Sequence, residues 1–568
     1  MLKKLYNNVD TLVEESQDGQ RLMYPEAGDI KIVNGTRLIV RQPKDKKPKG
    51  LVKIAGGYGS GHEGPGAGGV RPGGSDLGIP GEIFAAPAAN KIFRGLMEIN
   101  DGSPIILNVT NHTGDVLNSR LAIQMARAKG VDVHMHLIYD DIASAPKGEE
   151  KDRRAIGSVY SVMGTMAEWG ESVEDILRVA EKINTYTRSY GVGLRSAIHP
   201  VSGLPIMEMP EDEIELGIGV HGESSGNRIK LPRSRELAKI MCDALLDDMD
   251  AQPGEELAIS VRGLGGMTWT ELYIFFKDVY EYLQERQIKI YSTSSGNSGT
   301  QELGGIIVAF ARLDDEIKYW LNKGLPEHCY QDQTLTASET NETSDNQEES
   351  AVQEENTADP ANAENIAHLI AEMKAVASDL VARSEELCKL DSFVGDGDHG
   401  ISIRKGFSKV LENMELPAHS LEEVFTHCAD AALDSMGGAI GPIIASLFMG
   451  FAMASTGKTE LGIEDWEENF KKALEVVHNT GSANPGERTL VDTLYAAVNA
   501  FEEGKGNSDS EIWKLVERRA FEGAQSTKNM RARKGRARYL AEKSVGYVDA
   551  GAMSMYYFIR QIALAEME

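Results

Sequence analysis

Residues 390–400 read Leu-Asp-Ser-Phe-Val-Gly-Asp-Gly-Asp-His-Gly, and the second half of the chain is organised around this stretch. It gathers three carboxylates, Asp391, Asp396 and Asp398, within eight residues, and its glycines permit tight turns. Crowded carboxylates repel each other unless a hard divalent cation neutralises them, and Mg²⁺ prefers such oxygen ligands. The alternative is a solvated Asp/Gly turn between helices. An EF-hand is disfavoured because the twelfth loop position is not glutamate.

The sequence on both sides of this loop has a helical pattern. Ile366, Ile370, Met373, Val376 and Leu380 recur at spacings of three and four, which places them on one helix face. Further amphipathic segments follow, joined by short Gly- or Asp-rich stretches. Residues 366–568 are therefore predicted to form an all-α bundle.

The preceding segment, residues 334–365, has no aromatic residue, no Lys and no Arg, and it is rich in acids. It cannot bury enough apolar surface to offset the entropy of ordering, so it is predicted to be an acidic, disordered linker. Residues 1–333 alternate strand-like and helical patterns, which predicts an α/β half of two sub-domains with helix-covered sheets. The predicted strands are 37–41, 51–55, 105–109, 131–138, 258–262 and 288–291, and the predicted helices include 120–128, 173–185 and 272–286.

Composition restricts the function. The net charge of −28 argues against a nucleic-acid or anionic-membrane partner, whose phosphates would be repelled. No apolar run has the length of a membrane span, and the N-terminus has no signal-peptide core. The four cysteines are scattered, which is typical of reduced thiols without a zinc site or disulfide framework. We expect a cytoplasmic protein.

Three more glycine-rich joints lie in the helical half: residues 436–442 (MGGAIGP), 484–489 (NPGERT) and 535–551, which brings arginines. Singly, each is typical of a helix end. Together with the aspartate loop they resemble the nucleotide-binding domain of the dihydroxyacetone kinase family, in order and spacing. The resemblance implies that Asp391, Asp396 and Asp398 hold Mg²⁺ against the phosphates of ATP. The residues it implies for nucleotide contact are His399, Ser402, Gly438, Ala439, Ile440, Gly481, Leu490, Arg536, Asp549 and Gly551.

In the α/β half, the predicted strand 51–55 runs into a glycine-rich loop, Gly56–Glu63, that is not a P-loop because no Gly-Lys-Ser/Thr ends it. A second strand leads to Asp115, and residues 215–223 (ELGIGVHGE) set His221 between glycines. Loops at the carboxyl ends of strands are where open α/β sheets bind ligands. A lone histidine is more often a structural hydrogen-bonding group than a nucleophile.

These motifs resemble the substrate domain of the same family, in its ATP-dependent single-chain type. The resemblance implies that His221 adds to the carbonyl of a ketose to form a hemiaminal, that Asp115 accepts the proton of the attacking hydroxyl, and that His62 orients the substrate. Substrate contacts are implied for Gly59, Ser60, Gly61, His62, Thr110 and Asp115. The resemblance also favours a homodimer. The expected activity is ketose phosphorylation with Mg²⁺ and ATP; the alternatives are an FAD-AMP lyase (FMN cyclase) and a non-catalytic ketose sensor.

The chain departs from the family pattern at residues 64–72, 110–112 and 292–298, all expected near the carbonyl site, and at Ile440 and Ala550 near the nucleotide. Thr110 stands where a lysine is usual, and His112 stands where another aromatic residue is usual. We therefore expect a substrate other than plain dihydroxyacetone, such as erythrulose, apulose or another four- or five-carbon ketose.

Overall fold

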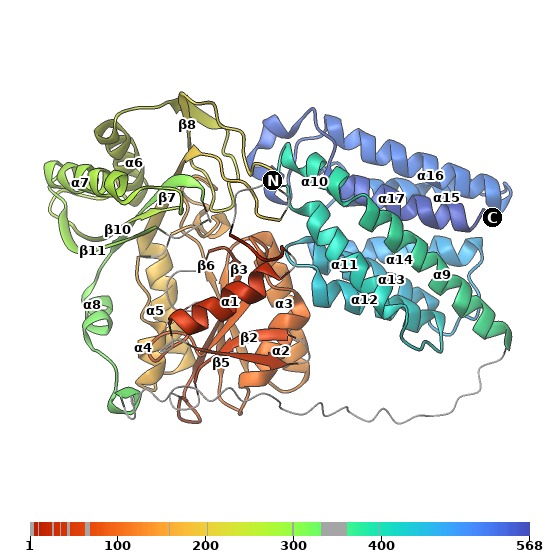
Figure 1. The fold of residues 1–568 in the computed structure, drawn as a ribbon, viewed down its shortest axis with the longest axis horizontal. Coiled ribbons are helices and arrows are strands. Elements are labelled where there is room, and N and C mark those ends of the chain that lie inside the picture. The colour runs from red at the N-terminus through yellow and green to blue at the C-terminus, as the bar shows by residue number, and fades with distance from the viewer. Residues whose placement is uncertain are drawn as a thin grey trace.

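The structure is a computed structural model. It describes residues 5–9, 11–24, 28–33, 36–42, 46–62, 69–157, 159–201, 203–297, 300, 302–330, 360–395 and 397–567. An α/β half with two sheets is followed by an all-helical half, and the two lie side by side (Figure 1). The predicted fold class is confirmed.

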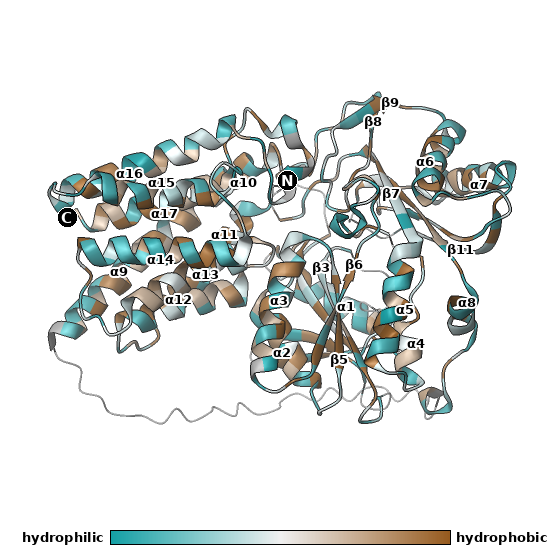
Figure 2. Ribbon diagram, turned by 180° about the vertical axis from the view of Figure 1, so that it is seen from behind, coloured by the Kyte–Doolittle hydropathy of each residue, from teal (hydrophilic) through white to brown (hydrophobic). Residues whose placement is uncertain are grey.

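The first sheet has the order β1-β2-β4-β3-β5-β6, in which β4, β3, β5 and β6 run parallel. Apolar side chains on both faces of its strands bury it between α2 and α3 on one side and α4 and α5 on the other (Figure 2). Its elements are β1 (Asp29–Val33), β2 (Thr36–Val40), β3 (Lys53–Ser60), β4 (Leu77–Ile83), β5 (Ile105–Thr110), β6 (Val133–Ile138), α2 (Ala89–Ile99), α3 (Thr113–Ala128), α4 (Met163–Glu168) and α5 (Val173–Tyr186).

The second sheet has the order β11-β10-β12-β7-β8-β9. One face packs on α6 and α7 through a core that includes Ile259, Val261 and Val308, and the other face is turned toward the first sub-domain. Its elements are β7 (Thr187–Arg195), β8 (Glu213–Leu216), β9 (Asn227–Lys230), β10 (Glu256–Gly263), β11 (Lys289–Asn297), β12 (Gly304–Arg312), α6 (Ser234–Met249) and α7 (Trp269–Glu285); α1 (Leu12–Met23) and α8 (Asp315–Asn322) lie outside the two sheets.

The helical half packs around aromatic side chains, among them Phe451, Trp466 and Phe470, whose rings lie 5.3–6.1 Å apart. None of the helices that the structure describes is long and apolar enough to cross a bilayer. The helices are α9 (Pro360–Ala382), α10 (Ser384–Ser392), α11 (His399–Asn413), α12 (Leu421–Ser435), α13 (Ile440–Ser455), α14 (Ile463–Gly481), α15 (Leu490–Glu503), α16 (Asp509–Ser526) and α17 (Ala550–Ala565).

Two predicted boundaries need correction. Residues 360–365, assigned to the linker, belong to α9, because Pro360 at the first helical position has the backbone angle a helix needs and no N–H to leave unpaired. The rest of the predicted linker, residues 334–359, lies outside the described residues. Helix α3 begins at Thr113, seven residues before the predicted start at 120, so Asp115 lies in its first turn. A carboxylate is favoured there by the positive end of the helix dipole.

Glu372 on α9 is a buried acid in the helical core. Its Oε1 atom is buried without a hydrogen-bond partner in the described structure, and burial together with the charge of Glu566 raises its pKa well above 4.5. The folded state therefore binds a proton that the unfolded state releases, so stability falls as the pH rises above 4.5. We expect Glu372→Gln to stabilise the helical half by roughly 1–3 kcal/mol at pH 8 and by less at pH 5. Calorimetric melting of both proteins at the two pH values measures this; an equal effect at both would contradict it.

Backbone and side-chain contacts join the two halves where α2 and α3 face the start of α13. The side-chain amide of Asn118 donates to the carbonyl oxygen of Gly438 at 2.6 Å, and the amide N–H of Gly438 donates to Ala86 at 3.2 Å. Asp434 accepts from Asn90 and pairs with Arg94, each at 2.9 Å. The end of α12 and the start of α13 are thereby held against the α/β half.

Candidate active site between the two halves

A cavity of about 530 Å³ lies between the α/β half and the helical half. Most of the residues predicted for substrate, nucleotide and metal line this one cavity. From the α/β half these are Gly59, His62, Thr110, Asp115 and His221; from the helical half they are Asp391, Asp398, His399, Ser402, Gly438, Ala439, Ile440, Gly481, Leu490, Asp549 and Gly551.

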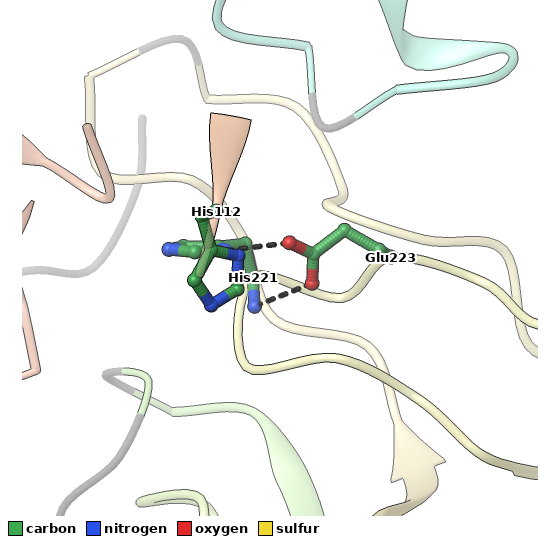
Figure 3. Close-up of side chains that lie close together, drawn as sticks. All are labelled: His112, His221 and Glu223. Atoms are coloured by element: carbon green, nitrogen blue, oxygen red, sulfur yellow. Dashed lines mark hydrogen bonds and ion pairs between the residues drawn. The ribbon is translucent and has the colours of Figure 1, made fainter. Parts of the chain in front are cut away.

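His221 is oriented by Glu223, two residues further along the same loop (Figure 3). Its ring Nδ1 lies 2.6 Å from Oε1 of Glu223, and its backbone N–H donates to Oε2 at 3.0 Å. Both residues are buried. Burial alone would raise the pKa of Glu223, but the neighbouring His221 outweighs it and holds that pKa well below the ordinary value. An ionised Glu223 keeps the proton of His221 on Nδ1, so Nε2 is the nitrogen with the available lone pair.

Other rings surround the imidazole of His221. The ring of His62 lies 4.8 Å away and that of His112 5.2 Å away, both edge-on, while Phe84 packs on His62 at 5.1 Å. His112, His221 and Glu223 are also close enough to share a metal ion. However, Nδ1 of His221 is bonded to Glu223, and Nε2 of His112 lies 2.9 Å from the carbonyl oxygen of Ala155. The cluster is better described as an oriented imidazole than as a metal centre.

The glycine-rich stretch after residue 55 was predicted to be a loop, and this prediction is wrong. The stretch continues β3 to Ser60. Hydrogen bonding to the neighbouring parallel strands extends it. As a result Ser60 is turned inward, where its hydroxyl donates to Gly81 at 2.7 Å, and it does not line the cavity; neither does Gly61. Gly61, with φ of +95°, ends the strand in a turn that brings His62 to the cavity.

The end of β5 brings Thr110, and the start of α3 brings His112 and Asp115, to the same wall. Gly114 lies there against the backbone of Gly438 in the other half: a Cβ atom on Gly114 would be 2.7 Å from it. The glycine therefore allows the two halves to approach closely.

Asp391 lies in the last turn of α10 and Asp398 immediately precedes α11, so the aspartate loop is a joint between two helices, as predicted. Oδ2 of Asp391 accepts from the backbone N–H of Gly397 at 2.9 Å. Burial and the charges of Asp391 and Glu223 raise the pKa of Asp398 well above its ordinary value. Two crowded, half-buried carboxylates on the wall of this cavity fit a divalent cation, which would relieve this repulsion. Asp396 lies outside the described residues.

The wall for the nucleotide comes from helix ends. Gly438, with φ of +69°, and Ala439 lead into α13, where Ile440 is the first residue. Asp549 precedes α17 and accepts from the N–H of Ala552 at 2.9 Å. Burial raises the pKa of Asp549 to about 6, although Arg488 opposes the shift. Arg536 begins a short 3-10 turn (Arg536–Tyr539) between Gly535 and Ala537, which both line the cavity.

Sequence reasoning missed two residues here. Glu223 stands in the quoted motif 215–223, yet only the folded loop shows that it bonds to His221. Arg488 stands in the quoted NPGERT motif; it is fully buried, pairs with Asp549 at 3.3 Å and lines the cavity. An arginine in a glycine-rich joint that is already suspected of binding phosphate was the available signal.

Comparison with known proteins agrees with this arrangement. Residues 21–327 match the Dak1 domain family and residues 393–564 match the DAK2 domain family. The chain is 28% identical to a D-erythrulose kinase of Mycolicibacterium smegmatis over 99% of this chain and 98% of that protein. It is 29% identical to the human triokinase/FMN cyclase, again over 99% and 98%.

The fold also matches a crystal structure of the dihydroxyacetone kinase of C. freundii in complex with AMP-PNP and Mg²⁺. The TM-score is 0.51 at 23% identity, and the match covers all of both chains. This chain belongs to the dihydroxyacetone kinase family and carries its Dak1 and DAK2 domains in one polypeptide.

Proposed function

We propose that the protein transfers the terminal phosphoryl group of ATP to a short-chain ketose that is held covalently on His221. One observation carries the proposal: the oriented imidazole of His221 and the crowded carboxylates Asp391 and Asp398 line one cavity. In this division of labour residues 1–333 bind the ketose, residues 334–365 connect the halves, and residues 366–568 bind Mg-ATP.

The covalent step uses Nε2 of His221. Its lone pair adds to the ketone carbon, the carbonyl oxygen takes up a proton from solvent, and Nδ1 passes its proton to the carboxylate of Glu223, which leaves a neutral hemiaminal. The hydrogen bond between Nδ1 and Glu223 persists, with the carboxyl group now the donor. Only a carbonyl compound can be captured in this way, so the bond selects ketoses over polyols.

His62 would orient the bound ketose, and Asp115 would accept the proton of the hydroxyl that attacks the phosphorus. Asp115 has the position for this, in the first turn of α3 on the cavity wall. Asp391, Asp398 and, by the sequence pattern, Asp396 would hold Mg²⁺, which when bound neutralises charge on the phosphates of ATP. The glycines at the helix ends, Gly438, Gly481 and Gly551, have no side chain and so leave room for the nucleotide to approach the protein backbone.

The substrate is expected to be larger than dihydroxyacetone. The relative from M. smegmatis is named for D-erythrulose, and His112 places an imidazole beside His221 in this chain. We expect kcat/KM for erythrulose or a pentulose to exceed that for dihydroxyacetone by about tenfold, in a coupled assay of ADP release with Mg-ATP. Equal or better turnover of dihydroxyacetone would contradict this, and glycerol, which has no carbonyl, is the negative control.

A second activity deserves a parallel assay because the human relative is named triokinase/FMN cyclase. FAD incubated with the protein and Mn²⁺, without any ketose, would release cyclic FMN and AMP if this chain shares it. A purely ketose-sensing role is less well supported, since a sensor has no use for the carboxylates at Asp391 and Asp398.

A further inference from the structure

The cavity wall contains a cation that the proposed chemistry does not use. Arg262 lies near the carboxyl end of β10 and lines the cavity with an exposed side chain. Its neighbours on the strand are buried, and Val261 points into the core under α6 and α7. Because side chains alternate along a strand, Arg262 points to the opposite face, toward the cavity.

This arginine differs from several other arginines of the α/β half. Arg153 and Arg188 both pair with Asp248, at 2.7 and 2.5 Å, and Arg154 pairs with Asp141 at 2.5 Å. The side chain of Arg262 has no hydrogen bond and no ion pair with any residue that the structure describes. An exposed guanidinium on a cavity wall, with no described carboxylate paired to it, is available to bind an anionic ligand.

Hydrogen bonds connect the end of β10 to the His221 loop. The N–H of Thr300 donates to the carbonyl oxygen of Leu264 at 2.8 Å, and the hydroxyl of Thr300 donates to the carbonyl oxygen of Val220. Arg262 lies two residues before Leu264 and opposite Ile307 of β12, which also lines the cavity. Arg262 therefore belongs to the wall of the α/β half, the same half that holds His221.

A bound ketose has one carbon arm on each side of its carbonyl carbon, and these positions indicate which way each arm points. The hydroxymethyl group to be phosphorylated must turn toward Asp391 and Asp398 in the helical half. The remaining arm then lies along the wall of the α/β half, where Arg262 is.

We propose that Arg262 binds a carboxylate at the end of this second arm, so that the enzyme's preferred substrate is an acidic ketose. The inference rests on the proposed function and specifies its substrate class. A guanidinium offers two parallel N–H donors that match a carboxylate. Without such a cation, a chain with a net charge of −28 would repel an acid from its active site.

The test compares four substrates: dihydroxyacetone, a pentulose, the pentulose 5-phosphate, and the pent-4-ulosonate in which the hydroxymethyl group remote from the carbonyl is oxidised to a carboxylate. We expect kcat/KM for the ulosonate to exceed that for the pentulose at least about tenfold in the unaltered protein. Arg262→Gln should lower this ratio by about 10- to 100-fold through KM, the size expected for hydrogen bonds to a charged group. Arg262→Lys should retain part of the preference. Arg235→Gln, an exposed arginine on α6 paired with Glu285, is the matched control.

Each result decides something. If Arg262→Gln keeps the ratio of kcat/KM for the ulosonate to kcat/KM for the pentulose unchanged, the inference is overturned. It is also overturned if Arg262→Gln raises the KM for ATP equally with every substrate, because this would assign Arg262 to the nucleotide. Preference for pentulose 5-phosphate over the ulosonate would overturn the carboxylate assignment. If neutral ketoses are phosphorylated and the acid is not preferred, only the role of Arg262 fails. If no ketose is phosphorylated, the proposed function fails with it.

Discussion

Replacing His221 with alanine should reduce kcat/KM for the best ketose by roughly 10³-fold or more, because the substrate loses the bond that holds it in place. The alanine side chain cannot supply a nucleophile, and it leaves the carboxylate of Glu223 without its ring partner. The measurement is ADP release at saturating Mg-ATP over a range of ketose concentrations. Intact-protein mass spectrometry should show a ketose adduct on the unaltered protein and none on His221→Ala.

His134→Ala is the matched control, because His134 lies on β6, pairs with Asp132 at 2.9 Å and does not line the cavity. It should keep both the activity and the adduct. A His221→Ala protein that phosphorylates its best substrate as well as the unaltered one would refute capture of the carbonyl by this residue.

Replacing Asp398 with asparagine should lower kcat by roughly 10²-fold or more while the ketose adduct on His221 persists. Asparagine keeps the shape of the side chain but removes the charge, so the cation that neutralises the phosphates is bound far more weakly. The two measurements test the two sides of the cavity separately. The mass of the adduct tests ketose capture by the α/β half, and ADP release tests whether the helical half also supports phosphoryl transfer. Raising the Mg²⁺ concentration should restore part of the activity.

Asp509→Asn, at an exposed position at the start of α16, is the control for a charge lost from the helical half. Loss of the ketose adduct in Asp398→Asn would mean that this residue serves the fold or the ketose rather than the metal. Full activity without any change in Mg²⁺ dependence would remove it from the proposed metal site.

Most of the elements could be predicted because their signals are local. The three- and four-residue spacing of Ile366 to Leu380 predicted α9, and the apolar run 105–109 predicted β5, which the structure extends by one residue. The extension of β3 through Gly56, Gly57 and Gly59 to Ser60 was not predicted. Glycines usually interrupt strands, and here pairing with the neighbouring strand β4 continues the strand beyond its last contact with β5.

The two halves and their classes could be predicted from the sequence alone, since periodicity depends on neighbours within a few positions. The residues of the cavity wall were predicted from the resemblance of their motifs to the dihydroxyacetone kinase family. The tertiary structure alone decided that these residues face one cavity, that Ser60 turns away from it, and that Glu223 orients His221. The physical reason is distance along the chain. Asn118 meets Gly438 across more than three hundred residues, and a contact of that kind depends on packing of the whole fold.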